Sequence, residues 1–410
     1  MDEMALRELL ASAVAAEPPM GPVVAAGLRA GRILRRRRLT RATVGSVAAL
    51  SVAVIVAPAL HGGLGRRGPA GPAPRSRPAA WVISHGGRIT PAGTTRGPLR
   101  PVATSSFPQA VITPDGQTIY VLTYPRVTPV STVTGRRGKR IAAGQTPDDI
   151  GITPNGKTVY VLSMQARTAT PINVRTDRPG RPIPVGIRPR NIVFTPDSRT
   201  AYVANQGPGT VTPINTATNK AGKPIRVGFS PLTLAITPNG KTVYVADGGT
   251  SVMPITVATN KPGKPIDIGS EPFALAVTPD GKTVYVVTGG NVVPIATATN
   301  TVGKPITVGH WPEDIVISAN GKEAYVLCQG YKVRGVWHGT ITPISTRTNR
   351  PGPIIPAGRY PIALAVSGDG KTLYVADYPS STVTAVSTAT NRGGRPIPVA
   401  RRPYFIIGAP

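Results

Sequence analysis

Residues 231–268 have the sequence PLTLAITPNGKTVYVADGGTSVMPITVATNKPGKPIDI. Short runs rich in Val, Ile, Thr and Tyr alternate here with Gly, Pro and Asn, which is typical of β-strands separated by tight turns. Asn239-Gly240 is a strong signal for a turn between two antiparallel strands. The pattern predicts four consecutive antiparallel strands, called A to D in chain order: Leu234–Ile236, Thr242–Ala246, Ser251–Thr256 and Pro265–Ile268.

The same pattern recurs along the chain. A Tyr inside a motif such as Thr-Val-Tyr-Val returns at intervals of 40 to 49 residues, and a Pro that precedes strand A forms a second series with one more member. Four antiparallel strands in about 41 residues predict one blade of a β-propeller. The two series are Tyr120, Tyr160, Tyr202, Tyr244, Tyr285, Tyr325 and Tyr374, and Pro108, Pro147, Pro189, Pro231, Pro272, Pro312, Pro361 and Pro403.

The two ends of the repeat array complement each other. The segment Trp81–Thr104 matches a repeat without its first strand, and Tyr404–Ile407 matches a first strand without the rest. Pairing the tail with the head would close the ring and remove exposed sheet edges. We therefore predict an all-β fold, an eight-bladed β-propeller of four-stranded antiparallel blades. A seven-bladed ring is the alternative if the head segment does not pack.

The repeat resembles a known family. Tyr202-Val203-Ala204-Asn205, followed by Thr210–Ile214 and Thr216-Ala217-Thr218-Asn219, is similar to the YVTN β-propeller repeat of YncE-like and surface-layer proteins. The resemblance covers residues 80–410 and implies a propeller of the cell envelope. It implies no particular activity, because a fold does not determine function.

Composition narrows the possible classes of protein. The 410 residues include 46 Gly and 46 Pro, which excludes an all-helical fold. The single cysteine, Cys328, lies in an apolar run and is expected to be a buried, inert thiol. Lys and Arg number 47 against 18 Asp and Glu, a formal charge of +29. Such a charge would attract nucleic acid, but we do not expect it as a physiological partner of an exported protein.

The first eighty residues predict export. An arginine cluster, residues 32–41, precedes the uncharged stretch 42–60, which is long enough to span a bilayer as a helix. We expect a cytoplasmic basic tail (1–41), a transmembrane helix (42–60), a flexible Gly/Pro linker (61–79) and the propeller (80–410) outside the cell membrane. Cleavage of a twin-arginine signal, with secretion of the propeller, is the alternative.

The repeat also sorts the connections onto two faces. A–B and C–D turns share one end of every blade, called the bottom face, and B–C and D–A connections share the other, called the top face. Most basic residues fall in the bottom turns, for example Lys157, Lys241 and Lys282. A face of one charge sign is expected to attract an anionic lipid or a wall polymer, although Asn-Gly-Lys is also a common solvated turn.

Top-face residues depart most from the repeat pattern. In the sixth complete repeat, Tyr325 and Pro343 are 18 residues apart, where Tyr244 and Pro254 are 10 apart, so a B–C loop Gln329–Gly339 is inserted. Aromatic and basic residues on loops of a rigid scaffold are typical of contact surfaces for a protein or polysaccharide partner. The candidate partner-binding residues are Trp311, Tyr331, Arg334, Trp337, His338 and Tyr360.

Acidic residues supply a second candidate site on the same face. With His310 they could hold a cation or act as acid and base at the mouth of the channel, although a solvated acidic loop is the favoured explanation. No motif assigns a catalytic residue, and no cofactor is expected. We predict a binding or scaffolding module, with a lactonase-like hydrolase or lyase as the alternative by analogy with other propellers. The acidic candidates are Asp148, Asp149, Glu313 and Asp314.

Overall fold

The computed structural model describes residues 78–85, 88–92, 109–333 and 335–409. Strands in these residues form eight antiparallel sheets, and each sheet is one blade. No helix suited to crossing a bilayer occurs in these ranges. The predicted segment 42–60 lies outside them, as do the tail and the linker up to residue 77.

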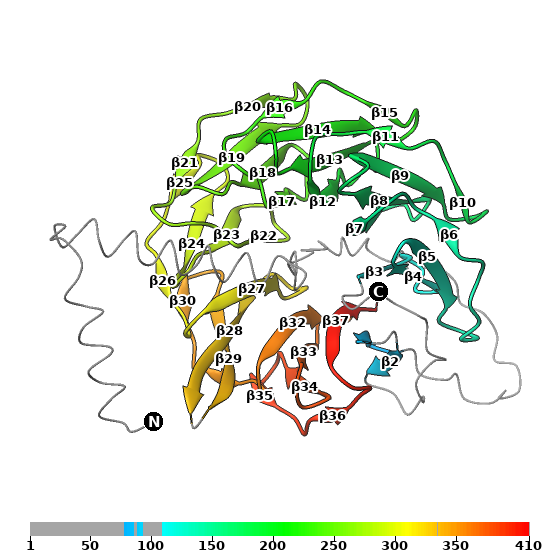
Figure 1. Cartoon of the computed structure of the whole chain (residues 1–410). Helices are drawn as coiled ribbons and strands as arrows, with labels where there is room; N and C mark the ends of the chain where they lie inside the picture. Colours follow the sequence, from blue (N-terminus) through cyan, green and yellow to red (C-terminus); the bar gives the residue numbers. More distant parts are fainter. Residues whose placement is uncertain (1–77, 86–87, 93–108, 334, 410) are drawn as a thin grey trace, which may run out of the picture. The chain divides into compact units, whose positions relative to one another are not determined.

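The innermost strand of each blade contacts the innermost strands of its two neighbours, so the blades close into a ring (Figure 1). Blades 1 to 7 follow the chain, and the composite blade joins the two ends of the described chain. In ring order the innermost strands are β3 (Ala110–Ile112), β7 (Pro147–Ile152), β12 (Pro189–Phe194), β17 (Thr233–Ile236), β22 (Ala274–Val277), β27 (Pro312–Ile317), β32 (Pro361–Val366) and β37 (Pro403–Gly408).

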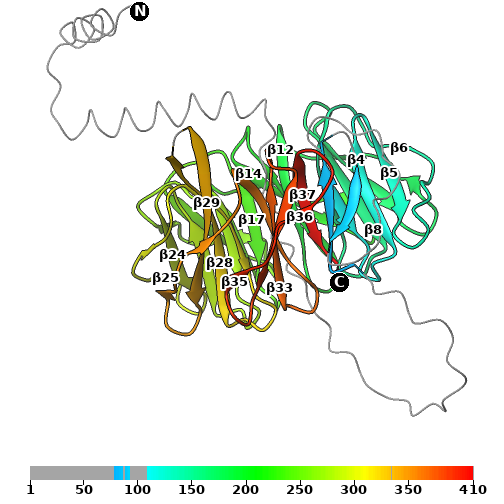
Figure 2. The ribbon, with the colours of Figure 1, turned by 90° about the horizontal axis from the view of Figure 1, so that it is seen from below.

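The second and third strands of each blade run between the two faces of the ring (Figure 2). The second strands are β1 (Ala80–Ser84), β4 (Thr118–Thr123), β8 (Thr158–Ser163), β13 (Thr200–Asn205), β18 (Thr242–Ala246), β23 (Thr283–Val287), β28 (Glu323–Val333) and β33 (Thr372–Asp377). The third strands are β2 (Ile89–Ala92), β5 (Arg126–Ser131), β9 (Thr168–Asn173), β14 (Thr210–Asn215), β19 (Ser251–Thr256), β24 (Asn291–Ala296), β29 (Val336–Ser345) and β34 (Thr382–Ser387).

Ring closure by the tail is confirmed. Strand β37 pairs with β1 in antiparallel register, with Phe405 opposite Ile83 and Ile406 opposite Val82. The side chains of Trp81 and Ile407 then pack with Ile119 of blade 1 in one buried cluster. Burying the edge of β1 under the last strand leaves no open break in the ring, and the count is eight blades rather than seven.

The hydrophobic core lies between blades. Alternate residues of β13 point to opposite neighbours: Tyr202 packs toward blade 4, whereas Val203 packs toward blade 2. This two-residue period is the reason that the motif Thr-Val-Tyr-Val has apolar residues at successive positions. Every blade interface within the described residues contains such a cluster, so the repeat motif specifies the contacts between blades.

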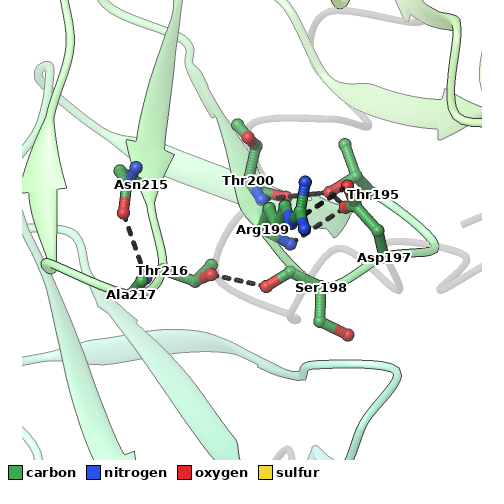
Figure 3. A network of polar contacts seen from close by, with 8 residues as sticks. All are labelled: Thr195, Asp197, Ser198, Arg199, Thr200, Asn215, Thr216 and Ala217. Carbon is green, nitrogen blue, oxygen red and sulfur yellow. Dashed lines mark hydrogen bonds and ion pairs between the residues drawn. The ribbon is translucent and has the colours of Figure 1, made fainter.

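The bottom turns between strands A and B owe their shape to polar side chains. In blade 3, the Thr195 hydroxyl and the Arg199 backbone N–H both donate to Oδ1 of Asp197, and the Thr216 hydroxyl donates to the carbonyl of Ser198 (Figure 3). In blade 4, Gly240 occupies the same turn with a φ of +67°, where Gly avoids the strain of a side chain.

The outermost strand differs from the prediction. Strand D was expected as one segment, Pro265–Ile268, but in blade 4 it consists of two bridges of two residues each. Outer segments of this kind are β6 (Ile141–Ala142), β10 (Arg178–Pro179), β11 (Ile183–Pro184), β15 (Lys220–Ala221), β16 (Ile225–Arg226), β20 (Lys261–Pro262), β21 (Ile266–Asp267), β25 (Thr301–Val302), β26 (Ile306–Thr307), β30 (Arg350–Pro351), β31 (Ile355–Pro356), β35 (Arg392–Gly393) and β36 (Ile397–Pro398).

Candidate binding surface on the top face

The inserted segment of blade 6 is a regular β-hairpin and not the loop expected for Gln329–Gly339. Strands β28 and β29 continue past the blade, and Lys332 lies opposite Trp337 near the tip. The register shifts between Cys328 and Tyr331, where Gly330 has a φ of +78°. A Cβ at Gly330 would lie 1.6 Å from the carbonyl oxygen of His338, so this bulge requires glycine.

Hydrogen bonds join the base of the hairpin to the D–A connection on each side. The backbone N–H groups of Gln329 and Gly330 donate to the carbonyls of Trp311 and His310, both at 2.9 Å. On the other strand, the Gly339 N–H donates to Gly358 at 3.1 Å, two residues before Tyr360. The structure therefore connects the hairpin with the two connections that carry the predicted aromatic residues.

The structure describes the side chains of some of the predicted partner-binding residues and not of others. Tyr331 and His338 stack across the hairpin, with ring centroids 6.1 Å apart and planes inclined by 24°. The side chain of Tyr331 is 55% exposed and that of Trp311 is 41% exposed. Residue 334 and the side chain of residue 337 lie outside what the structure describes, so Arg334 and Trp337 remain candidates from sequence.

Trp311 and Tyr360 have backbone φ angles of +56° and +47°. This conformation is uncommon for bulky residues. Thr146, Ser230 and other residues directly before the Pro of strand A adopt it as well. The unusual backbone is thus a property of the repeat, and only the aromatic side chains are particular to these blades.

Exposed apolar side chains are more numerous on the top face than on the bottom face. Phe229, Ile187 and Tyr124 were not among the residues predicted from sequence, and Phe229 is 71% exposed. For Ile187 and Phe229 the available signal was an apolar residue two positions before the Pro of strand A, where the other repeats have polar residues. Tyr124 lies in a B–C connection. The exposed large apolar residues in the described ranges are Tyr124, Ile187, Phe229, Trp311 and Tyr331 on the top face, and Val133, Val302 and Ile354 on the bottom.

The acidic candidates form two pairs on opposite sides of the ring. Asp148 and Asp149 belong to β7, and Glu313 and Asp314 belong to β27, four positions away among eight innermost strands. Within the described ranges, no three His, Cys, Asp or Glu side chains gather as a metal site would require. The structure therefore does not bring the two pairs, with His310, into one site.

The buried carboxylate of each pair accepts a hydrogen bond from a backbone N–H group. Oδ1 of Asp149 accepts a 2.9 Å bond from the Ile150 N–H, and burial raises the pKa of this carboxyl to about 8. Burial likewise raises the pKa of Asp314 to about 7. In blade 3 the equivalent residue is Asn191, which accepts a bond from the Leu234 N–H of blade 4. That equivalence indicates a structural role between blades for this position.

The exposed member of the first pair has a charged partner. Asp148 forms a salt bridge of 3.0 Å with Arg190 of the neighbouring blade, and the Arg190 side chain is only 13% exposed.

Cys328 lies in β28 of blade 6. Its thiol is buried and free, and burial raises its pKa to about 12. The prediction of a buried Cys328 is confirmed.

Comparison with solved structures supports the fold. Similar structures are propeller proteins: the hydrazine synthase of Kuenenia stuttgartiensis (23% identity, TM-score 0.56, covering 72% of this chain and 98% of that one) and the dihydro-heme d1 dehydrogenase NirN (14%, 0.69, 83% and 78%). AztD from Citrobacter koseri is similar over 81% of this chain and 98% of its own, with 14% identity and a TM-score of 0.60. Identities this low indicate a shared fold alone.

Comparison of the sequence gives no family. No family model matches the chain. No curated protein matches it either.

Proposed function

We propose that this propeller is a binding module that receives a partner on its top face. The observation that carries the proposal is the β28–β29 hairpin, which is bonded to both neighbouring D–A connections and adds Tyr331 to the exposed Trp311. Exposed aromatic side chains on a rigid scaffold bury large areas at a small cost in conformational entropy. The class of partner that fits is a protein or a polysaccharide.

The location of the module is also a proposal. The similarity to the YVTN repeat and the predicted segment 42–60 favour an envelope protein anchored with its N-terminus in the cytoplasm and its propeller outside. Secretion after cleavage is the alternative. Fractionation of cells that express the full chain tests this: an anchored protein stays with membranes after a high-salt wash, whereas a cleaved one is found in the medium with a shortened N-terminus.

Site-directed crosslinking tests the binding surface. A photoreactive amino acid at Tyr331 should give discrete crosslinked products in intact cells. The same substitution at Val133, which is exposed on the bottom face, is the matched control. Binding to purified cell-wall polysaccharide should fall at least about 10-fold in the Tyr331→Ala, Trp311→Ala double variant, if sugar is the partner. Equal crosslinking from both positions and unchanged binding would contradict the proposal.

The enzymatic alternative rests on one observation, the raised pKa values of Asp149 and Asp314, because perturbed carboxyl groups collect at active sites. A screen of lactones and esters addresses it directly. Turnover that is lost in Asp314→Asn, and in Glu313→Ala or His310→Ala beside it, would favour the hydrolase or lyase function over the binding module.

A further inference from the structure

In blades 2 to 7 the outer strand is interrupted opposite the same position of the third strand. That position is Pro213 in blade 3 but Ala385 in blade 7, where the interruption also occurs, so the break does not require a proline. The carbonyl of Pro213 accepts a 2.8 Å bond from the Gly222 N–H, and the chain bulges outward between β15 and β16. Pro171, Pro254 and Pro294 accept the equivalent bond in their own blades.

A cation follows the bulge glycine in most blades. In blade 4 the sequence Gly263-Lys264-Pro265 places Lys264 on the outside of the bulge, where it is exposed. A second cation often occupies the first bridge of the outer strand, as Lys220 and Arg392 do. The cations at the bulge position, all exposed, are Lys139, Arg181, Lys223, Lys264, Lys304 and Arg395.

In the described residues these bulges form a belt along blades 1 to 7, which we call the rim. The second outer segment of one blade contacts the first outer segment of the next, from β6 and β10 around to β31 and β35 (Figure 1). At the seam of blades 3 and 4, a pocket of about 470 Å³ is lined by Lys223, Arg226 and Asn260. The rim sequences contain no aromatic residue.

Half of the six inner bottom turns that carry a cation also carry an aspartate, at Asp197, Asp280 and Asp369. In those turns Arg199 and Lys282 lie 3.9 Å from the carboxylates of Asp197 and Asp280. In the part of the chain that the structure describes, none of the bulge cations forms an ion pair with a carboxylate. Two acidic residues lie in the C–D turns and outer segments of that part: Asp177, which accepts a bond from the Tyr120 hydroxyl, and Asp267 of β21, which accepts from the Thr250 hydroxyl. The rim therefore carries a large excess of positive charge.

We propose that the rim binds a linear polymer with a phosphate backbone, which follows the circumference from blade to blade. A flat membrane can meet only a part of a belt that curves around the ring, whereas a flexible chain can contact successive blades. Without aromatic side chains the rim cannot stack nucleobases, so recognition is through phosphate alone. This surface is separate from the hairpin, and the proposal does not depend on the top-face partner.

Binding of long-chain inorganic polyphosphate to the full chain tests the proposal. At equal phosphate concentration and physiological salt, long chains should bind much more tightly than tripolyphosphate, because only they span several blades. Substituting Arg181, Lys223, Lys264 and Lys304 with Gln should weaken binding at least about 10-fold. Each lost phosphate contact should lower the slope of log K against log salt by roughly 0.7, so the four substitutions together should lower it by about 3.

The matched control removes the same charge from the inner turns, with Arg199, Lys241, Lys282 and Lys371 changed to Gln. It should weaken polyphosphate binding less than about 3-fold, as should replacing the rim lysines by Arg. The Tyr331→Ala variant should bind polyphosphate normally, which separates this surface from the hairpin. Equal losses in the rim and inner-turn variants, tighter binding of single-stranded DNA of equal charge, or binding to anionic vesicles but not to polyphosphate would each overturn the proposal.

Discussion

The hydroxyl of Tyr202 donates a hydrogen bond of 2.7 Å to Oδ1 of Asn260, which lies in the C–D turn of the next blade. The bond joins the second strand of one blade to a turn of its neighbour, and Asn260 has a φ of +54°, a conformation that Asn tolerates well. The same bond recurs from Tyr160 to Asn219 and from Tyr244 to Asn300, at 2.6 and 2.8 Å. The Tyr and the Asn of the repeat therefore act as a pair, and the hydrogen bond between them holds neighbouring blades together.

The composite blade shows that the two positions change together. Trp81 replaces the Tyr there and has no hydroxyl, and Gly135 stands in the turn of blade 1 where blade 2 has Asp177 and blades 3 to 7 have Asn. Gly135 has a φ of +71°, so the turn conformation is kept while the side-chain partner is lost. This substitution pair supports the view that the Asn is present for the Tyr hydroxyl.

Removing one such hydroxyl should loosen one blade interface. We expect Tyr202→Phe to lower the free energy of unfolding by about 1 kcal/mol, because the carbonyl of Asn260 loses its donor in a partly buried site. The measurement is the urea midpoint. Tyr331→Phe, which changes an exposed ring at the hairpin tip, is the control and should leave the midpoint unchanged; an equal decrease in both variants would contradict the interpretation.

Ring closure predicts complementation in trans. A chain that ends at Arg402 lacks β37, so the edge of β1 and the apolar side chains of Trp81 and Ile83 lose their cover. We expect this truncated chain to unfold at lower urea and to expose hydrophobic surface to a dye such as ANS. A synthetic peptide of residues 403–410 should restore the midpoint, and a scrambled peptide should not.

The buried carboxyl of Asp149 predicts a dependence of stability on pH. Its pKa is about 8 in the folded state against 3.8 for an exposed Asp, so the folded state favours the protonated form. The stability that this preference provides is complete below pH 4 and is lost as pH rises toward 8. Asp149→Asn should therefore be more stable than the wild-type chain at pH 8, and the difference should shrink toward pH 5.

A matched variant controls for net charge in that experiment. Asp197 is an exposed turn residue whose pKa is lowered, first by the hydrogen bond from Thr195. Asp197→Asn removes the same charge but should bring no benefit that grows with pH. A pH profile that is identical for the two variants, measured by urea unfolding, would show that Asp149 is ionised in the folded protein.

The repeat made most of the fold predictable. Strands B and C of blade 4 were predicted at the bounds observed for β18 and β19, because a two-residue period and Asn-Gly turns are local signals. Strand D was not, since the break in its pairing occurs opposite Pro254 in blade 4 but also opposite Ala385 in blade 7, so no single residue signals it. The hairpin was missed for a similar reason. The sequence shows that repeat six has extra residues, but it does not show whether they form a loop or pair with each other as two strands.

The candidate site was less predictable than the fold. The connection from His310 and Trp311 to the hairpin runs through backbone groups, which have no signature in side-chain sequence. The two acidic pairs were predicted to share one site because both stand where a D–A connection enters strand A on the top face. That they lie four blades apart, on opposite sides of the ring, becomes clear only from the order of the blades in the closed ring. Burial of Asp149 likewise depends on the neighbouring blade.

The bulge at Gly330 predicts how the hairpin is held. Gly330→Ala would place a Cβ against the carbonyl of His338, so the hairpin must shift and weaken the bonds from Gln329 and Gly330 to the preceding D–A connection. We expect faster amide hydrogen exchange at these two residues, with little change in the urea midpoint of the ring, because the hairpin lies outside the interfaces between blades.

Gly335, at the turn of the same hairpin, is the matched control. Its φ is +84°, so an Ala there has a similar backbone cost, but no atom lies within 4 Å of the added Cβ. Gly335→Ala should therefore leave exchange at Gln329 and Gly330 unchanged. If both variants accelerate exchange equally, the effect comes from backbone strain in the hairpin and not from its close approach to His338. If neither does, the bonds to the D–A connection do not hold the hairpin in place.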